Sequence, residues 1–297
     1  GSLLVSWGPD VVHSESAKVL PVVFDAMRIN VDNELLQTNA VYALSSIVQG
    51  NAYAVAYLRQ EQNEIVLAHV LEKHVESKRI RQGLMQVVIL VEGVRGLLSA
   101  MGKYDHQGMH NDILWTMANC PSDDGDDEVI NADAIEHVVS VAKRWGVDVM
   151  MNAVAAMKKL LLMLLGSRAS PSSTRGQPQL VNVGEKAVAF LVEVLRDESS
   201  TAALRSIACE GLAGAAQQNS GVRSFLLDSS HCLEFLARWQ PSERLNVKET
   251  TNILLLAGVL QNSVDPVLQA MAVSPKKQGL QQAACSALVQ LAIADED

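Results

Sequence analysis

The chain has 297 residues, of which 48% are hydrophobic and only 4% aromatic. A composition rich in Ala, Val and Leu but poor in rings suits thin layers of closely packed helices better than one wide core. The formal net charge of −9 at pH 7 argues against a general nucleic-acid-binding protein, because such proteins gain affinity by neutralising phosphates with Lys and Arg. The same charge is compatible with a basic partner.

The cysteines and the apolar runs indicate the compartment. Cys120, Cys209, Cys232 and Cys285 are far apart and form no C-x-x-C motif, so we expect reduced, buried thiols and a cytoplasmic protein. We expect no secretory signal peptide. The most apolar run, 160–165, is too short to span a bilayer, so no membrane association is expected.

An internal repeat dominates the sequence. Residues 25–48 align without a gap with residues 269–292. The shared positions are Ala26/Ala270, Met27/Met271, Leu36/Leu280, Gln37/Gln281, Ala40/Ala284, Ala43/Ala287 and Leu44/Leu288, with Ile47/Leu291 as a conservative match. The offset of 244 residues (Ala26 to Ala270) divides into six steps of roughly 41, a period typical of helical repeats.

We therefore predict an all-α fold with one continuous domain, 1–297. It divides into a partial cap at 3–17 and units at 18–64, 65–93, 94–133, 134–184, 185–230, 231–264 and 265–297. We expect 121–133, which is rich in Asp, to form an acidic loop. The Ser/Pro/Gly/Gln-rich segment 167–184 is expected to be a flexible insertion.

The first unit shows the expected helix signals. Val19–Met27 reads as a helix with Pro21 in its first turn, where the missing N–H is harmless. A second helix is expected over Leu35–Gly50, with Gly50 just beyond its C-terminus. Its apolar residues Leu36, Ala40, Ala43, Leu44 and Ile47 share one helical face.

Later units keep this pattern. Further helices are expected at 65–74, 79–92, 94–104 and 109–120, and the helical parts of the later units are expected at 134–165, 185–218, 231–261 and 265–294. The same five positions are filled by Ile80, Leu84, Val87, Val88 and Val91, and again by Leu204, Ala208, Gly211, Leu212 and Ala215.

Two apolar helices per unit, the second Ala/Leu-rich and opening with Gln, resemble armadillo repeats, with HEAT repeats as near neighbours. The segments Ala40–Gly50 and Ile113–Cys120 are similar to the third helix of armadillo repeats of the importin-α and β-catenin type. This resemblance implies a right-handed α-α superhelix of about six to seven repeats. Its third helices would line a concave groove that holds an extended peptide.

In that family a Trp followed four residues later by Asn contacts the peptide. Trp115 and Asn119 match this spacing, and Tyr42/Ser46 takes the same place in the first unit. The other equivalents are Gln86/Leu90, Glu210/Gly214 and Ser286/Gln290. Because the pair is not repeated at successive steps, we do not expect cargo binding of the nuclear-import type.

The candidate partner-binding residues share polar or aromatic character at these positions. They are Tyr42, Ser46, Gln86, Trp115, Asn119 and Gln290, with Asn39 and Asn111 as weaker candidates. An Asn amide both donates to and accepts from a peptide backbone, and a Trp ring supplies a flat apolar wall. The alternative for Trp115 and Asn119 is purely structural, a half-buried Trp with an Asn near a helix end.

Other motifs favour no chemistry. His106 and His110 have a spacing that allows a metal pair on one helix, but Gly108 separates them and no third ligand is apparent. The acidic cluster 123–127 lacks the order of oxygen ligands of a calcium loop. No G-x-S-x-G, P-loop, G-x-G-x-x-G or H-E-x-x-H is present. We therefore expect no enzyme, no metal, no cofactor and no small-molecule substrate.

Two functional hypotheses follow. The first is a non-enzymatic scaffold that binds a peptide or protein partner along the groove. The alternative is a regulatory or co-chaperone module that clamps a folded domain, as armadillo-like domains do in nucleotide-exchange factors, myosin co-chaperones and autoinhibitory segments.

Overall fold

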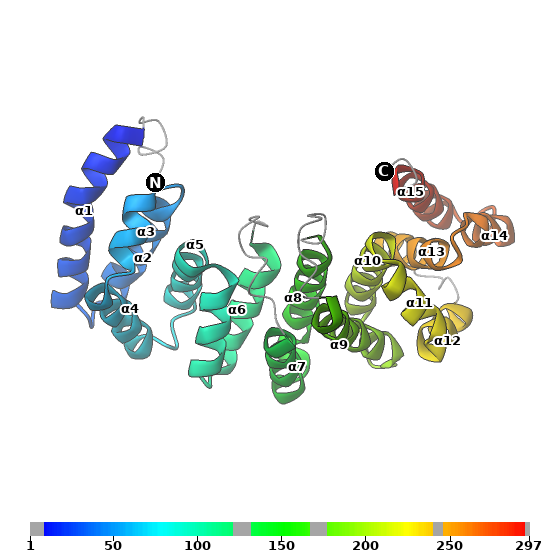
Figure 1. Cartoon of the computed structure of the whole chain (residues 1–297), viewed down its shortest axis with the longest axis horizontal. Helices are drawn as coiled ribbons and strands as arrows, with labels where there is room; N and C mark the ends of the chain where they lie inside the picture. Colours follow the sequence, from blue (N-terminus) through cyan, green and yellow to red (C-terminus); the bar gives the residue numbers. More distant parts are fainter. Residues whose placement is uncertain (1–8, 121–131, 167–176, 240–245, 295–297) are drawn as a thin grey trace. The chain divides into compact units, whose positions relative to one another are not determined.

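The computed structural model describes residues 9–120, 132–166, 177–239 and 246–294 (Figure 1). All regular structure in these ranges is α-helical, so the all-α prediction is confirmed. The helices are α1 (Pro9–Ile29), α2 (Glu34–Val48), α3 (Ala52–Leu58), α4 (Glu61–Lys73), α5 (Lys78–Lys103), α6 (Gln107–Asn119), α7 (Ala132–Trp145), α8 (Val147–Gly166), α9 (Gln177–Arg196), α10 (Ala202–Gln218), α11 (Ser220–Asp228), α12 (Ser230–Arg238), α13 (Val247–Gln261), α14 (Asp265–Val273) and α15 (Gln278–Ala294).

The chain forms two compact units, Gly1–Pro121 and Ser122–Asp297. The boundary falls at the start of the predicted acidic loop 121–133, of which 121–131 lies outside the described residues. One continuous domain over 1–297 stays a prediction.

In the first unit the long helices lie side by side in chain order. Helix α2 packs against α5, and α5 packs against α6 (Figure 1). Helix α1 contacts α2, α3 and α4. Large apolar side chains fill the space between them, among them Phe24, Leu44, Ile80 and Met109, all fully buried.

The second unit repeats this arrangement with other helices. Helix α8 packs against α10, α10 against α13, and α13 against α15. Shorter helices contact this series: α9 packs on α8 and α10, α11 on α10 and α13, and α14 on α13 and α15. The predicted stripe of 185–218 is buried throughout, from Leu204 to Ala215.

One hydrogen-bonding position recurs at the start of five long helices. The fourth residue of the helix bonds through its side chain to a backbone carbonyl that precedes the helix. These residues are Gln37, Arg81, His110, Arg205 and Gln281, which bond to the carbonyls of Met27 and Asn30, Val75, Met101, Ser200, and Met271 and Ser274 respectively.

The two Gln residues of the internal repeat make identical bonds. Gln37 Nε2 donates to Met27 O and Asn30 O, both at 2.9 Å. Gln281 Nε2 donates to the equivalent carbonyls of Met271 and Ser274, at 3.0 and 3.2 Å. The carbonyls at the end of a helix lack intrahelical partners, so these amides fix the angle between paired helices.

Two arginines at this position also tie successive long helices together. Arg81 Nε donates to Asp112 Oδ2 at 2.7 Å, joining α5 to α6. Arg205 Nε donates to Glu249 Oε1 at 3.0 Å, joining α10 to α13. Sequence reasoning missed both ion pairs, because the paired residues are 31 positions apart in the first pair and 44 in the second.

Glycines with positive φ end or break helices. Gly50 has φ +70° and directly follows the C-cap residue of α2, as predicted. Gly93 has φ +66° and breaks α5 into the two predicted helices 79–92 and 94–104. Gly146, with φ +58°, separates α7 from α8 within the predicted segment 134–165.

Three boundary predictions were wrong. Helix α1 begins at Pro9, so Pro21 lies in its interior; the helix continues because Leu20, Phe24 and Met27 bury one shared face. Helix α9 begins at Gln177, within the predicted insertion 167–184, because Pro178 falls in its first turn, where proline is tolerated. Helix α3 was not predicted. Residues 167–176 lie outside the described residues.

The predicted apolar stripe of α2 was wrong in part. Leu44 and Ile47 are buried, but Leu36 and Ala40 are half-exposed and Ala43 is exposed. The face that packs against α5 instead contains Gln37, Val41, Leu44 and Val48. The stripe and this face are neighbours on the helix, and spacing alone could not separate them.

Helix α5 is the one helix in the described ranges whose length and apolar composition would suffice to cross a membrane. Helix α5 breaks at Gly93 and packs against α2 and α6, so its apolar residues belong to the core of the first unit.

Loss of the Arg81–Asp112 ion pair tests how the long helices are held. Side-chain exposure is 9% for Arg81 and 3% for Asp112. We expect Asp112→Ala to lower the free energy of unfolding by about 3–5 kcal/mol, because it leaves a buried guanidinium unpaired. Urea unfolding followed by circular dichroism measures this change.

Asp25→Ala is the matched control. Its ion pair with Arg28 is exposed, at 64% and 41%, so the expected change is under about 1 kcal/mol. Equal losses in the two variants would contradict the assignment.

Candidate functional site

Three predicted residues lie on successive helices of the first unit. Tyr42 on α2 is 47% exposed, Trp115 on α6 is 41% exposed, and Gln86 on α5 is half-buried. Because α5 packs against both α2 and α6, the three residues lie on neighbouring helices, and we call them the row. Packed helices lie about 8–10 Å apart, so the row matches roughly five or six residues of extended chain at ~3.3 Å each.

The position of Trp115 is fixed by the turn before it. Asp112 Oδ2 accepts from Arg81 Nε at 2.7 Å, and Asp112 Oδ1 accepts from Gln82 Nε2 at 3.1 Å. Both donors lie on α5. Two bonds to one carboxylate restrict rotation and sliding of α6 against α5, so the exposed Trp115 ring is held on a rigid helix.

Tyr42 is positioned by a close approach of α2 and α5. A Cβ at Gly83 would lie 2.6 Å from Val41 Cγ1 and 3.9 Å from Tyr42 Cε1. A larger residue at this position would force the Val41 side chain or the helices to shift. The Tyr42 ring therefore lies beside the α5 backbone, in the row with Gln86.

Ser46 and Asn119 are exposed, as a partner-binding role requires, and both bond to their own helix. Ser46 Oγ donates to Tyr42 O at 3.0 Å, and Asn119 Nδ2 donates to Trp115 O at 2.7 Å. An Asn amide carries a second N–H and a carbonyl oxygen with two lone pairs. Asn119 can thus accept from a peptide N–H while it keeps its helical bond.

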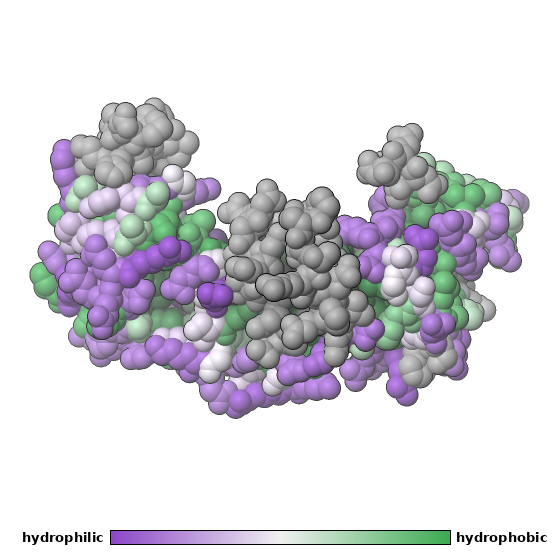
Figure 2. Space-filling view, in the orientation of Figure 1, coloured by the Kyte–Doolittle hydropathy of each residue, from purple (hydrophilic) through white to green (hydrophobic). Residues whose placement is uncertain are grey.

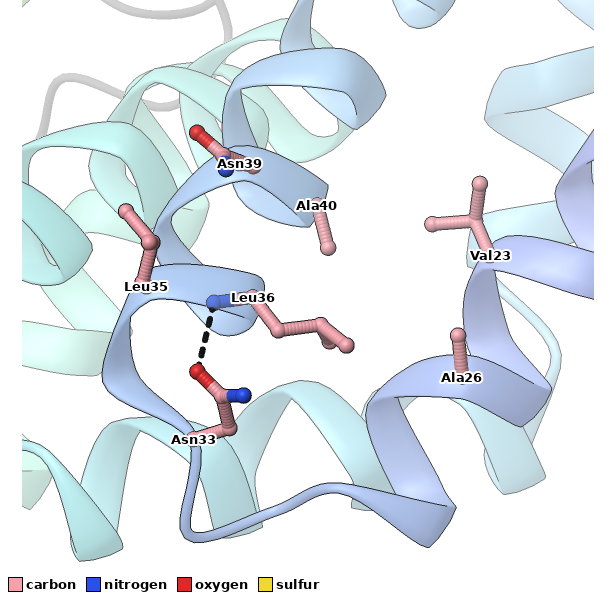
Figure 3. A pocket seen from close by; sticks show the side chains of 7 residues that line it. All are labelled: Val23, Ala26, Asn33, Leu35, Leu36, Asn39 and Ala40. Atoms are coloured by element: carbon pink, nitrogen blue, oxygen red, sulfur yellow. Dashed lines mark hydrogen bonds between the residues drawn. The ribbon is translucent and has the colours of Figure 1, made fainter.

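The weaker candidates are placed differently. Asn111 is half-buried, one turn before Trp115 on α6. Asn39 lines a groove of about 480 Å³ between α1 and α2 (Figure 3). Leu36 and Ala40 of α2 point toward Val23 and Ala26 of α1 across this groove. Sequence reasoning missed the groove because it assigned Leu36 and Ala40 to the core.

Gln290 is exposed on α15 and belongs to the second unit, so it is not in the row of Tyr42, Gln86 and Trp115. In that unit the position equivalent to Tyr42 on α10 is Glu210. Its Oε1 accepts from Lys158 Nζ of α8 at 2.7 Å. The equivalent position therefore carries an ion pair in place of an aromatic ring.

The histidines considered for a metal have structural contacts. His106 is the N-cap of α6, and its Nδ1 accepts from Met109 N at 3.1 Å. His110 is buried and its Nε2 bonds to Met101 O at 3.1 Å. Over the residues that the structure describes, no group of three or more His, Cys, Asp and Glu could hold a metal ion.

The cysteines divide into two classes. Cys120, Cys209 and Cys232 are buried as expected, whereas Cys285 is exposed, so its assignment to the core was wrong. Cys285 lies on α15, on a side of the helix that is open to solvent among the described residues. Burial raises the pKa of the Cys209 thiol well above its ordinary value and that of Cys232 to about 11.

No protein-family model matches this chain, and no curated protein shows a significant similarity to it.

Thiol reactivity tests this division. The thiolate is the reactive form, so a raised pKa lowers reactivity at a given pH. At pH 8 a thiol with a pKa of about 11 is roughly one part in a thousand thiolate. We expect an aromatic disulfide reagent to modify Cys285 first, and Cys209 and Cys232 only after urea unfolding. Peptide mass mapping identifies the modified residues, and equal rates for Cys232 and Cys285 would contradict the burial.

Proposed function

We propose that this chain is a non-catalytic scaffold that binds an extended peptide or protein segment on the face formed by α2, α5 and α6. The observation that carries the proposal is that exposed Tyr42 and Trp115 and half-buried Gln86 lie on three successively packed helices. Large aromatic side chains at 41–47% exposure on rigid elements are typical of recognition surfaces.

The chemistry of the row suits backbone recognition. The two rings offer flat apolar walls, and Gln86 and Asn119 offer amides that bond to a peptide N–H or C=O whatever its side chains are. None of the four carries a charge, so this part of the site would not select by charge. The net charge of −9 favours a basic partner over the surface as a whole.

We further propose that the helices belong to an armadillo-like right-handed superhelix of about six to seven repeats, a number within the range of such arrays. The three-helix groups α3–α4–α5 and α11–α12–α13, each ending in its longest helix, support this. The identical bonds of Gln37 and Gln281 support it as well.

Peptide binding is tested by selecting ligands from a random peptide library on the immobilised chain and measuring Kd by fluorescence anisotropy. We expect Trp115→Ala with Asn119→Ala to weaken binding by at least about 30-fold, since truncating a binding hot spot costs about 2 kcal/mol or more. The matched control is Trp145→Ala with Asn152→Ala, the same change in the second unit, and it should leave Kd unchanged.

Three outcomes separate the hypotheses. Equal losses in both double variants, or no loss in either, would contradict the row as the binding site. The co-chaperone alternative, a clamp on a folded domain, predicts instead that unstructured peptides do not bind and that a folded chaperone domain does. Circular dichroism of each variant establishes that it is folded.

A further inference from the structure

The two copies of the internal repeat differ in which side is covered. On α1 and α2, Val23, Leu36 and Ala40 are half-exposed and Asn39 is exposed. We call these four residues the leading face. At the offset of 244 (Ala26 to Ala270) their equivalents are Val267, Leu280, Ala283 and Ala284, with exposures of 0–1%.

Helices of the same chain cover the second copy of this face. Helix α13 packs on both α14 and α15. Leu233 and Leu236 of α12 and Ile253 and Leu254 of α13 line a cavity of about 730 Å³ together with Leu280. The leading face on α1 and α2 instead opens into the groove of about 480 Å³ (Figure 3). Apolar helices of the α12–α13 kind therefore fit a face of this type.

The opposite side shows the reverse pattern. On α1 and α2 it consists of Phe24, Val41, Leu44 and Val48, which are 0–1% exposed. Helices α3 and α4 pack on α1, and α5 packs on α2.

The equivalents on α14 and α15 are Leu268, Cys285, Leu288 and Ala292, which we call the trailing face. Leu268 is 47% exposed, Cys285 and Ala292 are exposed, and Leu288 is half-exposed. Hydrophobic surface is visible over α15 in Figure 2.

We propose that a second copy of this chain covers the leading face, with the trailing face of one copy packed on the leading face of the next. The contact continues an interface that the fold already makes within each unit, where α2 meets α5 and α13 meets α15. Apart from Asn39, the residues of both faces are apolar, so a contact between them would remove hydrophobic surface from water. The inference rests on the repeat and is independent of the peptide-binding proposal.

The contact is heterologous, because two different surfaces meet, so it can extend beyond a dimer. Two features weaken this contact between copies. Asn39 stands where Gly83 and Ala283 stand in the covered faces, and its larger polar side chain separates the surfaces. The net charge of −9 makes copies repel one another, so added salt should strengthen the contact.

Sedimentation equilibrium of the whole chain, with a thiol reductant to keep Cys285 free, tests the proposal. We expect the average mass to rise above 32.1 kDa with concentration, and to rise further for Asn39→Ala. Leu36→Glu on the leading face and Leu288→Glu on the trailing face should each give a monomer. A mixture of these two variants should give a dimer and nothing larger, because each retains the one face that the other lacks.

Matched variants separate association from misfolding. Ile65→Glu, at a 61% exposed position on α4 outside both faces, should associate like the wild type. Ala40→Glu and Ala292→Glu should reproduce the two single-face variants if either Leu change lowers the thermal transition.

A chain that stays monomeric up to roughly 1 mM, or a variant mixture that does not dimerise, would overturn the proposal. Association that begins only after removal of residues 1–8 would also overturn it, in favour of that segment as the occupant of the leading face.

Discussion

The fold depends on hydrogen bonds between side chains near the start of a helix and the backbone carbonyls that precede that helix. A helix ends with carbonyls that have no partner within it, and burying them unpaired is costly. In this chain the fourth residue of five long helices bonds to a carbonyl that precedes the helix, and Gln37 and Gln281 make two such bonds each. The angle between neighbouring helices is thus set by side chains at one repeated position.

Where that residue is Arg, the same side chain also fixes the next long helix. Arg81 bonds to Val75 O behind it and to Asp112 ahead of it. Arg205 does the same with Ser200 and Glu249. The exposed ring of Trp115 follows Asp112 by one turn, so the bonds that hold the core of the first unit also fix the helix that carries Trp115.

Sequence patterns predicted the parts that depend on local chemistry. The all-α class, the left-handed glycine after α2 and the buried stripe from Leu204 to Ala215 follow from composition, turn residues and helical period. Tyr42 and Trp115 are exposed, as partner binding would require, and their role in binding stays a prediction.

The remaining features depend on which helix lies next to which. Leu36 and Ala40 are as apolar as core residues, yet they face α1 across a groove and stay half-exposed, whereas Leu280 and Ala284 are buried in a unit where α13 packs on both α14 and α15. Cys285 is also exposed. The continuation of α1 through Pro21 likewise follows from burial of Phe24 and Met27, which a local rule for proline does not include.

The Lys158–Glu210 pair gives the second unit a different chemistry at the position of Tyr42. Its side chains are 25% and 37% exposed, so water and dissolved ions reach them and weaken their attraction. A molecule that binds along α8 and α10 would have to compete with the Lys158–Glu210 ion pair. Its affinity would therefore change with the salt concentration. A molecule on the uncharged rings of α2 and α6 would meet no such contact, so binding to the first unit and binding to the second would respond differently to the same change of buffer.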